Sequence, residues 1–313
     1  MKNSHRVIAV VVFTLLVGAI FTFLPISSAS NSVNTNYKDI TVHTSVNITN
    51  SKPEVLGVIV YDSSNSSLGN ITISAGGFKS VTCNASVRDW NGYNDIVRVN
   101  ATLFFNGNKS SDSNDNNTHY TNASCTTNSS IGTYTGSYSC VFNVMYYANN
   151  GTWYCNVTAK DAYPNPNSSS YNFNTTVFYP VYALNVSDGI NYGSIAVEEY
   201  SADIGANITN FGNMPINITV EGYGVNRSDG LAMNCSISGN ISVGNERFTT
   251  ISGTGFGSKT SLSSSAQIIS GLTMPKQTIS DTPIINATYW QLYIPPNPAG
   301  NCTGYVLFSA TTS

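Results

Sequence analysis

Side chains able to do catalytic chemistry are few in this chain of 313 residues, of which 9% are charged. Nucleophilic catalysis needs a base beside a serine or cysteine, and the chain contains no G-x-S-x-G motif. Only His43 and His119 lie outside the N-terminal segment, and we interpret both as surface residues. The stretch "GTGFGSKT" at 253–260 is close to the phosphate-binding P-loop, but Ser258 stands where that motif requires glycine. We interpret it as a flexible hairpin loop and expect a protein that is not an enzyme.

Two groups of oxygen-bearing side chains could bind a hard cation such as calcium. Asp89 and Asp95 flank "WNGYN", and Asp112, Asn114 and Asn116 alternate within "DSNDNN". The second group does not fit the EF-hand loop, because it lacks both the glycine at loop position six and the closing glutamate. We interpret both groups as solvated turn residues, so the sequence predicts no metal and no cofactor.

The six cysteines are the remaining reactive groups. A zinc site needs clustered ligands such as C-x2-C pairs, and no two of these cysteines are closer than 15 residues in the sequence. An even number of cysteines in an exported chain favours disulfides instead. The cysteines are Cys83, Cys125, Cys140, Cys155, Cys235 and Cys302.

The N-terminus predicts export. A basic stretch precedes Val7–Leu24, a run of 18 residues without a charge, and the small residues of "PISSAS" follow it. This pattern is typical of a signal peptide over residues 1–30. A retained membrane anchor is the alternative, because a membrane span needs roughly 20 residues. Either outcome predicts an extracellular or cell-surface protein, and the net charge of −3 argues against a nucleic-acid partner.

The rest of the chain follows an all-β pattern. Short runs of Val, Ile, Thr, Tyr and Phe alternate with polar residues and are interrupted by Asn, Gly, Ser and Asp. About seven such runs in each half predict two β-sandwiches in tandem. The expected strands span 40–48, 55–61, 79–88, 96–105, 137–147, 151–160, 172–180, 182–187, 204–210, 215–222, 233–243, 264–270, 287–294 and 303–310.

We place the domain boundary near 181, where "FNTTVFYPVYALNVSDG" runs almost without a turn and predicts a stiff junction. A flexible lead at 31–38 would precede a first sandwich at 39–181, and the second would occupy 182–313. The long polar stretch 107–135 is expected to be an insertion that forms a mobile or ligand-facing loop.

Side-chain alternation assigns two cysteines to a core. Alternate side chains of a strand point to opposite faces. In 151–160, Trp153 and Cys155 share the apolar face, and in 79–88 Cys83 lies on the apolar face too. Cys83 and Cys155 therefore lie on the core faces of separate strands, which fits a disulfide between two sheets.

The residues around these cysteines resemble a known fold. "VTCNASVRDWNGYNDI" and "NNGTWYCNVTAKD" look like the B and F strands of an immunoglobulin-like sandwich. Trp153 stands two residues before the second cysteine, where such domains place a tyrosine whose hydroxyl bonds to the backbone. Tryptophan has no hydroxyl, so the resemblance does not extend to that hydrogen bond. Of the three pairings that four cysteines allow, we favour Cys83–Cys155 with Cys125–Cys140, and Cys235–Cys302 in the second half.

The second half has a resemblance of its own. "NFGNMPINITVEGYG" and "PAGNCTGYVLFSA" are similar to the β-sandwich modules of archaeal exported surface proteins. These framework motifs imply an immunoglobulin-like fold and an exported location.

Asn-x-Ser/Thr sites suggest glycosylation. There are 21, while composition alone would give about 10, and several lie opposite the apolar face of an expected strand. We predict a glycoprotein with sugars on its outer sheet faces. The candidates are Asn84, Asn100, Asn150, Asn156, Asn207, Asn217, Asn234 and Asn301.

Together these features predict a non-enzymatic structural or adhesive glycoprotein of the cell envelope, with envelope proteins or surface glycans as partners. One alternative is a carbohydrate-binding module that uses the 107–135 insertion and nearby aromatic residues. A second alternative is a fibre subunit in which residues 38–48 add a strand to a neighbouring subunit. The aromatic residues are Trp90, Tyr93, Tyr134, Tyr138, Tyr146 and Tyr147.

Overall fold

The computed structural model describes residues 41–62, 70–162, 169–187 and 189–313. Thr49–Ser313 forms one compact unit, from which the residues up to Ile48 are separate. The predicted signal peptide or anchor and the lead at 31–38 lie outside the described residues. Within the described ranges, no helix has the length and apolarity needed to cross a membrane.

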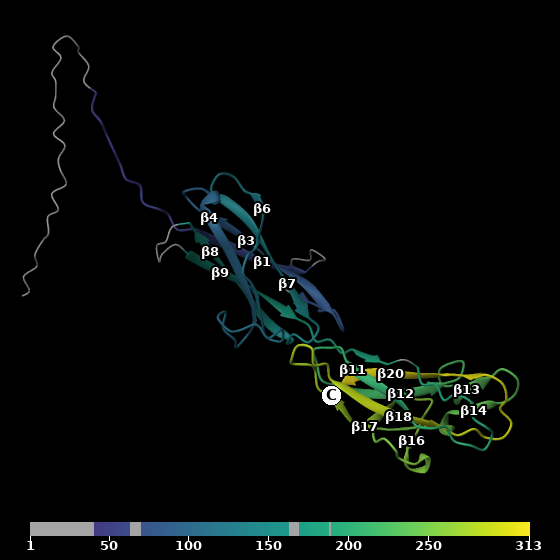
Figure 1. Cartoon of the computed structure of the whole chain (residues 1–313). Coiled ribbons are helices and arrows are strands. Elements are labelled where there is room, and N and C mark those ends of the chain that lie inside the picture. The colour runs from purple at the N-terminus through teal and green to yellow at the C-terminus, as the bar shows by residue number, and fades with distance from the viewer. Residues whose placement is uncertain (1–40, 63–69, 163–168, 188) are drawn as a thin grey trace, which may run out of the picture. The chain divides into compact units, whose positions relative to one another are not determined.

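The chain is all-β, as the sequence predicts, and its first half builds one sandwich (Figure 1). One sheet has the strand order β1-β3-β7-β6, and the other has the order β2-β9-β8-β4-β5. The strands are β1 (Glu54–Asp62), β2 (Asn70–Ile71), β3 (Phe78–Arg88), β4 (Ile96–Phe105), β5 (His119–Asn122), β6 (Thr126–Ser130), β7 (Thr135–Met145), β8 (Gly151–Asp161) and β9 (Ser169–Phe178).

The second half contains three sheets. Their strand orders are β10-β11-β18-β15-β16, β17-β12-β20 and β14-β13-β19. The first two enclose a core around Trp290, while the third belongs to a smaller apolar cluster. The strands are β10 (Leu184–Val186), β11 (Ile204–Asn210), β12 (Ile216–Tyr223), β13 (Leu231–Cys235), β14 (Asn240–Ser242), β15 (Glu246–Thr249), β16 (Thr260–Ser261), β17 (Gln267–Met274), β18 (Ile285–Leu292), β19 (Cys302–Thr303) and β20 (Tyr305–Thr312).

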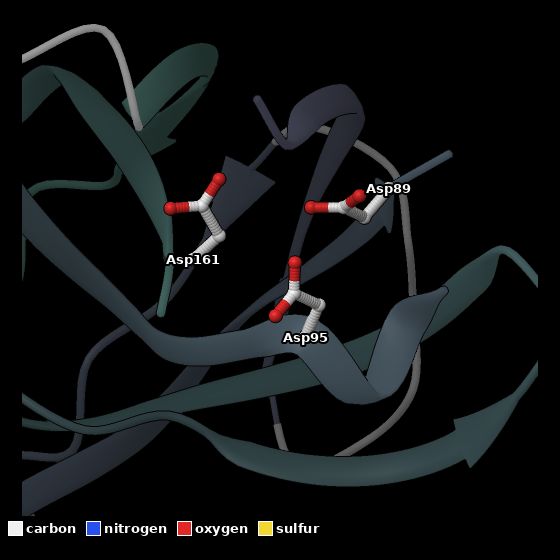
Figure 2. A group of neighbouring side chains, drawn as sticks. All are labelled: Asp89, Asp95 and Asp161. Atoms are coloured by element: carbon white, nitrogen blue, oxygen red, sulfur yellow. The ribbon is translucent and has the colours of Figure 1, made fainter. Parts of the chain in front are cut away.

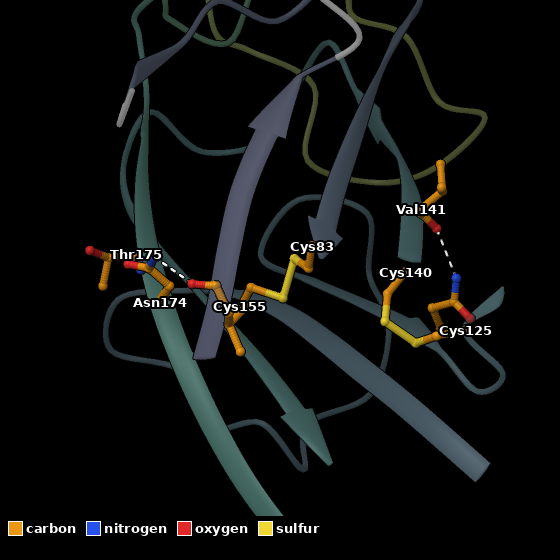
Figure 3. The surroundings of a disulfide bond; sticks show 9 residues. Cys83, Cys125, Cys140, Val141, Cys155, Asn174 and Thr175 are labelled. Atoms are coloured by element: carbon orange, nitrogen blue, oxygen red, sulfur yellow. Dashed lines mark hydrogen bonds between the residues drawn. A yellow bond between two sulfur atoms is a disulfide. The ribbon is translucent and has the colours of Figure 1, made fainter. Parts of the chain in front are cut away.

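The predicted disulfides form in the predicted pairs. Cys83 on β3 bonds to Cys155 on β8, so this bridge joins the two sheets of the first sandwich (Figure 3). Cys125–Cys140 and Cys235–Cys302 are the other two. Cys83 and Cys140 are directly opposite each other on adjacent strands. Their side chains therefore share a face of the sheet, but Cys83 bonds across the core and Cys140 bonds to the strand connection before β6.

Trp153 replaces the missing hydroxyl of the immunoglobulin tyrosine with its indole nitrogen. Its side chain is fully buried, and Nε1–H donates to the carbonyl of Asn149 at 2.8 Å. That carbonyl lies four residues upstream, which is the kind of backbone bond that the tyrosine makes in antibody domains. Trp153 also packs against Phe178 with a ring separation of 4.9 Å. The local anchor is therefore kept with different chemistry.

Three expected elements differ from the structure. Residues 41–48 form no strand, although they follow the alternating pattern. The expected strand 233–243 is a hairpin of β13 and β14, since Gly239 takes a positive φ of 66° between them. The predicted insertion at 107–135 is not a loop throughout, because β5 and β6 lie within it.

The indole hydrogen bond predicts a measurable stability difference. Trp153→Phe keeps an aromatic ring but leaves the buried Asn149 carbonyl without this donor. We expect the free energy of unfolding to fall by about 1–3 kcal/mol from the lost bond, as measured by denaturant titration. Tyr154→Phe is the matched control, because Tyr154 lies on the opposite face of β8. Equal losses for the two variants would contradict the role of the indole N–H.

Candidate functional site: the open side of the second sandwich

The first sandwich has the complete strand set of an immunoglobulin fold. That fold places strands A, B, E and D in one sheet and strands C, F and G in the other. In chain order, β1-β3-β7-β6 correspond to A-B-E-D. The facing sheet β9-β8-β4-β5 corresponds to G-F-C plus a fourth strand, and β2 extends it beside β9.

In the second sandwich, the described residues supply all of these strands except one. Its sheet β10-β11-β18-β15 corresponds to A-B-E-D. In the facing sheet β12 directly follows B and is strand C, and β20 pairs with it as strand F. Among the described residues nothing pairs with the outer edge of β20, where the first sandwich has β9. No described strand therefore takes the position of strand G.

Part of the core is exposed beside this edge of β20. Val306, Phe308 and Ala310 on β20 pack against the core but are only partly buried. In the first sandwich the corresponding face of β8, which includes Val157 and Ala159, is fully buried beneath its neighbours. The difference follows from topology, because each sandwich has apolar residues on this strand but only the first has a strand G beside it.

A cavity of about 440 Å³ marks this open side. We call it the β10–β20 groove. Leu184 and Val186 line it from β10, and Val306 and Phe308 line it from β20. A second cavity of about 800 Å³ shares Tyr192 and other residues with the first, so the hollow continues toward β19. The groove lies between the edge strands of two sheets and is lined largely by apolar side chains.

A carboxyl group lies among the groove residues. Glu246 on β15 is 2% exposed, and its Oε1 accepts a hydrogen bond from the Tyr192 hydroxyl at 2.7 Å. Burial raises the pKa of Glu246 to about 7, although the Tyr192 hydrogen bond acts in the opposite direction. Burial and the neighbouring Glu246 also raise the pKa of Tyr192. When Glu246 is protonated, it therefore adds no charge to the groove.

The interpretation of Asp89 and Asp95 as solvated turn residues is wrong for Asp89. The Asp89 side chain is fully buried, and Asp161, at the end of β8, is 1% exposed. Ligand oxygens of Asp89, Asp95 and Asp161 all lie within 4.8 Å of one another (Figure 2). Burial is the main cause of a raised Asp89 pKa, and the charges of Asp95 and Asp161 raise it further. The structure thus forms a carboxylate cluster that the sequence did not predict.

The second predicted oxygen group is held by hydrogen bonds within its own loop. Asp112 Oδ2 accepts from the Lys109 amide at 2.9 Å, and Asn114 Oδ1 lies 3.0 Å from Nδ1 of His119. His119 was expected at the surface, but it is fully buried in β5. The loop covers its ring, and Nε2 lies 3.3 Å from the Ser110 carbonyl. These residues therefore serve the fold of the loop.

Half of the residues proposed for an aromatic sugar-binding patch lie below the surface. Tyr138, Tyr146 and Tyr147 are buried, with exposed fractions of 5%, 6% and 1%. Trp90 and Tyr134 are exposed and form a ring pair at 5.5 Å. Three of the six aromatic residues are thus unavailable to a ligand.

The near-match to a P-loop also has a structural role. Residues 253–260 connect β15 to β16, which pair as a hairpin. The side chain of Lys259, the basic residue of the motif, is fully buried and forms an ion pair with Asp203 at 2.8 Å. A phosphate would have to compete with this carboxylate for a buried ammonium group.

The glycosylation candidates lie off the core faces. All eight are exposed or half-buried, as their position in the alternating pattern predicts. Asn207, Asn234 and Asn301 are the exposed ones. Attachment of sugar to any of them remains a prediction.

Comparisons with known proteins give no family. No family model matches the chain, and no curated protein matches it. The resemblance of the second half to archaeal exported modules therefore stays a prediction.

The chain is similar at low identity to several solved structures. The CsuC–CsuE chaperone–tip adhesion subunit complex of Acinetobacter baumannii has 10% identity and a TM-score of 0.40, covering 77% of this chain and 96% of that chain. A chaperone–tip adhesin complex of CFA/I fimbriae has 11% identity and a TM-score of 0.31, covering 84% of each chain. The C-terminal domain of the AgI/II polypeptide BspA of Streptococcus agalactiae has 8% identity and a TM-score of 0.24, covering 82% of this chain and 99% of that chain. At these identities the likeness concerns the fold alone.

The buried carboxyl of the groove predicts a pH-dependent stability. Because the folded-state pKa of Glu246 is about 7, above its ordinary value of about 4.3, its contribution to stability is present at low pH and is lost as the pH rises through 7. We expect the free energy of unfolding to fall by at most about 3 kcal/mol between pH 5 and 8, with Glu246→Gln flattening this slope. Glu199→Gln, at an exposed position, should keep the slope. An unchanged slope in Glu246→Gln would contradict the assignment.

Proposed function

We propose that the protein is an extracellular structural subunit that assembles by strand addition, in which the β10–β20 groove of one copy receives an extended segment of another. The observation that carries the proposal is the outer edge of β20, which pairs with no described strand. An unpaired strand edge offers a row of backbone N–H and C=O groups, and an added strand can bond to them. The partly buried apolar residues of the groove supply contacts for alternate side chains of that strand.

Residues 41–48 are the proposed occupant. Their sequence, "TVHTSVNI", places Val42, Val46 and Ile48 on one face if the segment is extended. These three side chains are 74%, 83% and 80% exposed, and the segment belongs to no strand. Its eight residues equal the length of β20. The segment therefore has the length and the alternation of a strand without having a partner strand.

The acceptor is a second copy because the chain's own groove is out of reach of this segment. Asn50, two residues after the segment, bonds to Asp161 at the end of β8 at 2.6 Å. The connection to the second sandwich follows Phe178, which is opposite Gly151 at the start of β8. These two ends are separated by the 11 residues of β8, or about 35 Å. One residue between Ile48 and Asn50 cannot span that distance, so insertion joins different molecules.

The chemistry of the chain supports an exported location. Three disulfides are typical of proteins that fold in an oxidising compartment. The predicted signal peptide or anchor and the predicted glycans agree with a secreted or cell-surface protein. A structural role without catalysis fits a chain whose groove presents mainly apolar side chains.

The assembly can be tested with the exported protein. We expect the wild type to form oligomers whose mass rises with protein concentration in light scattering, and Val42→Asp/Val46→Asp to remain monomeric because two charges would enter an apolar groove. His43→Asp/Ser45→Asp is the matched control, since it adds the same carboxylates on the opposite face of the same segment. An excess of the peptide "TVHTSVNI" should block assembly of the wild type.

Two results would overturn this proposal. A wild-type protein that stays monomeric at all concentrations and does not bind the peptide would exclude strand addition by this segment. Oligomers of Val42→Asp/Val46→Asp equal to those of the control would show that another surface joins the copies. Val186→Arg, which places a charged side chain in the groove, provides an independent block from the acceptor side.

The glycosylation prediction has a separate readout. We expect the intact mass of the native protein to exceed that of the polypeptide, which is 33.4 kDa for the full chain, and peptide mapping to find sugar at Asn207, Asn234 and Asn301 because these are exposed. Enzymatic or chemical removal of glycans is the control. A mass equal to that of the processed polypeptide would exclude glycosylation.

A further inference from the structure

We propose that Asp89, Asp95 and Asp161, together with Asn50, form a binding site for a divalent hard cation of the calcium type in the first sandwich. The proposal does not depend on the strand-addition function, because the site lies within one copy and needs no partner.

Three separate parts of the fold bring the carboxylates together. Asp89 directly follows β3, Asp95 ends the short 3-10 turn Tyr93–Asp95, and Asp161 is the last residue of β8. Figure 2 shows the three carboxylates directed toward a common space. The ends of β3 and β8 belong to opposite sheets, so the site closes one end of the sandwich across its core.

The spacing fits a single calcium ion. One oxygen from each carboxylate lies within 4.8 Å of the other two. Calcium–oxygen distances are about 2.3–2.6 Å, so two ligands on opposite sides of one ion are about 5 Å apart. The three oxygens therefore all fit within one coordination sphere. Carboxylate and amide oxygens are the ligand types that calcium prefers.

Buried acceptors without donors point to a missing positive charge. Asp89 is fully buried, and its Oδ1 accepts from the Asn91 amide at 2.8 Å while its Oδ2 has no hydrogen-bond partner. Oδ2 of Asp95 is likewise buried without a donor. The ion pairs between described residues give neither Asp89 nor Asp95 a basic partner. Burying the charges of Asp89 and Asp95 side by side is costly, and a bound cation would offset that cost.

Asn50 adds a neutral oxygen to the same place. Its Nδ2 donates to Asp161 Oδ2 at 2.6 Å, while its own Oδ1 is buried and has no hydrogen-bond partner. If the Asn50 amide turned its oxygen to the ion, it would add a neutral donor to the carboxylates, with water completing the six to eight ligands that calcium takes. This unpaired amide oxygen is an observation separate from the acidic residues themselves.

The cation would join the start of the compact unit to both sheets. Asn50 is its second residue, and the Ser51 amide donates to Asn91 Oδ1 at 2.6 Å. A bound ion would thus fix the point at which residues 41–48 enter the first sandwich. This consequence rests on the proposed function, whereas binding of the ion does not.

Calcium titration of the exported full-length protein tests the site. After chelation, we expect added Ca²⁺ to raise the thermal unfolding temperature, and at a concentration one hundred times its Kd to lower the unfolding equilibrium constant about 100-fold. Tb³⁺, a luminescent substitute for Ca²⁺, should show emission sensitised by the neighbouring Trp90 and be displaced by Ca²⁺.

Matched variants separate this site from general cation effects. Asp95→Asn removes a ligand charge at a half-buried position, so folding should survive while both the Ca²⁺ shift and the Tb³⁺ signal are lost. Glu199→Gln removes one exposed carboxylate and should retain both. Failure of Ca²⁺ to shift wild-type unfolding would overturn the proposal, as would a Ca²⁺ shift of wild-type size in Asp95→Asn. Stabilisation by Asp89→Asn, together with no Ca²⁺ response of the wild type, would show that the carboxylates share a proton instead.

Discussion

A β-sandwich keeps its core dry only if both sheets extend far enough to cover it, and this requirement distinguishes the two halves of the chain. In the first, β9 continues the sheet beyond β8 and buries its apolar face completely. In the second, the sheet ends at β20, and Phe308 remains partly buried although it packs on Trp290 at a ring separation of 5.6 Å. The cavity and its lining residues on β10 and β20 lie at this edge.

Adding a strand to β20 has both a favourable and an unfavourable contribution to the free energy. Burying an exposed valine or isoleucine contributes about 1.5–3 kcal/mol, while ordering each residue of a flexible segment costs about 1–2 kcal/mol. The three apolar side chains of residues 41–48 do not offset the ordering of eight residues by themselves. The backbone bonds along β20 and the burial of the groove's own apolar residues must supply the remainder. Both the donor and the acceptor therefore have to be complementary.

The alternation of apolar and polar residues predicted which side chains of a single strand point toward the core. It placed Cys83, Cys155 and Trp153 inward, because a strand's side chains report its two faces directly. It made no prediction for His119, which we assigned to the surface as part of the polar insertion and which the loop around Asn114 covers. Such coverage depends on where a loop folds back, which no local pattern encodes. The surface position assigned to Tyr146 failed for another reason, since Phe211 and Gln277 of the second half contact this side chain.

The carboxylate cluster and the groove were hidden from the sequence by distance along the chain. Asp89 and Asp161 are 72 residues apart, the same separation as Cys83 and Cys155 on the same two strands. The disulfide fixes how β3 and β8 face each other. Because each aspartate follows its cysteine by six residues, the ends of the two strands also lie close together. The alternation of side chains and the disulfide pairing together therefore predict the carboxylate cluster, although neither predicts it alone.

The placement of donor and acceptor on different sandwiches determines what kind of assembly strand addition would build. The donor segment enters the first sandwich at the Asp161 end of β8, and the acceptor groove lies in the other sandwich. The two surfaces differ, so each copy that uses one still offers the other. Head-to-tail contacts of this kind form a ring only if the rotation between copies closes, and otherwise they form an open filament. The affinity of such an assembly would depend on the groove, because the groove supplies the contacts for the added strand.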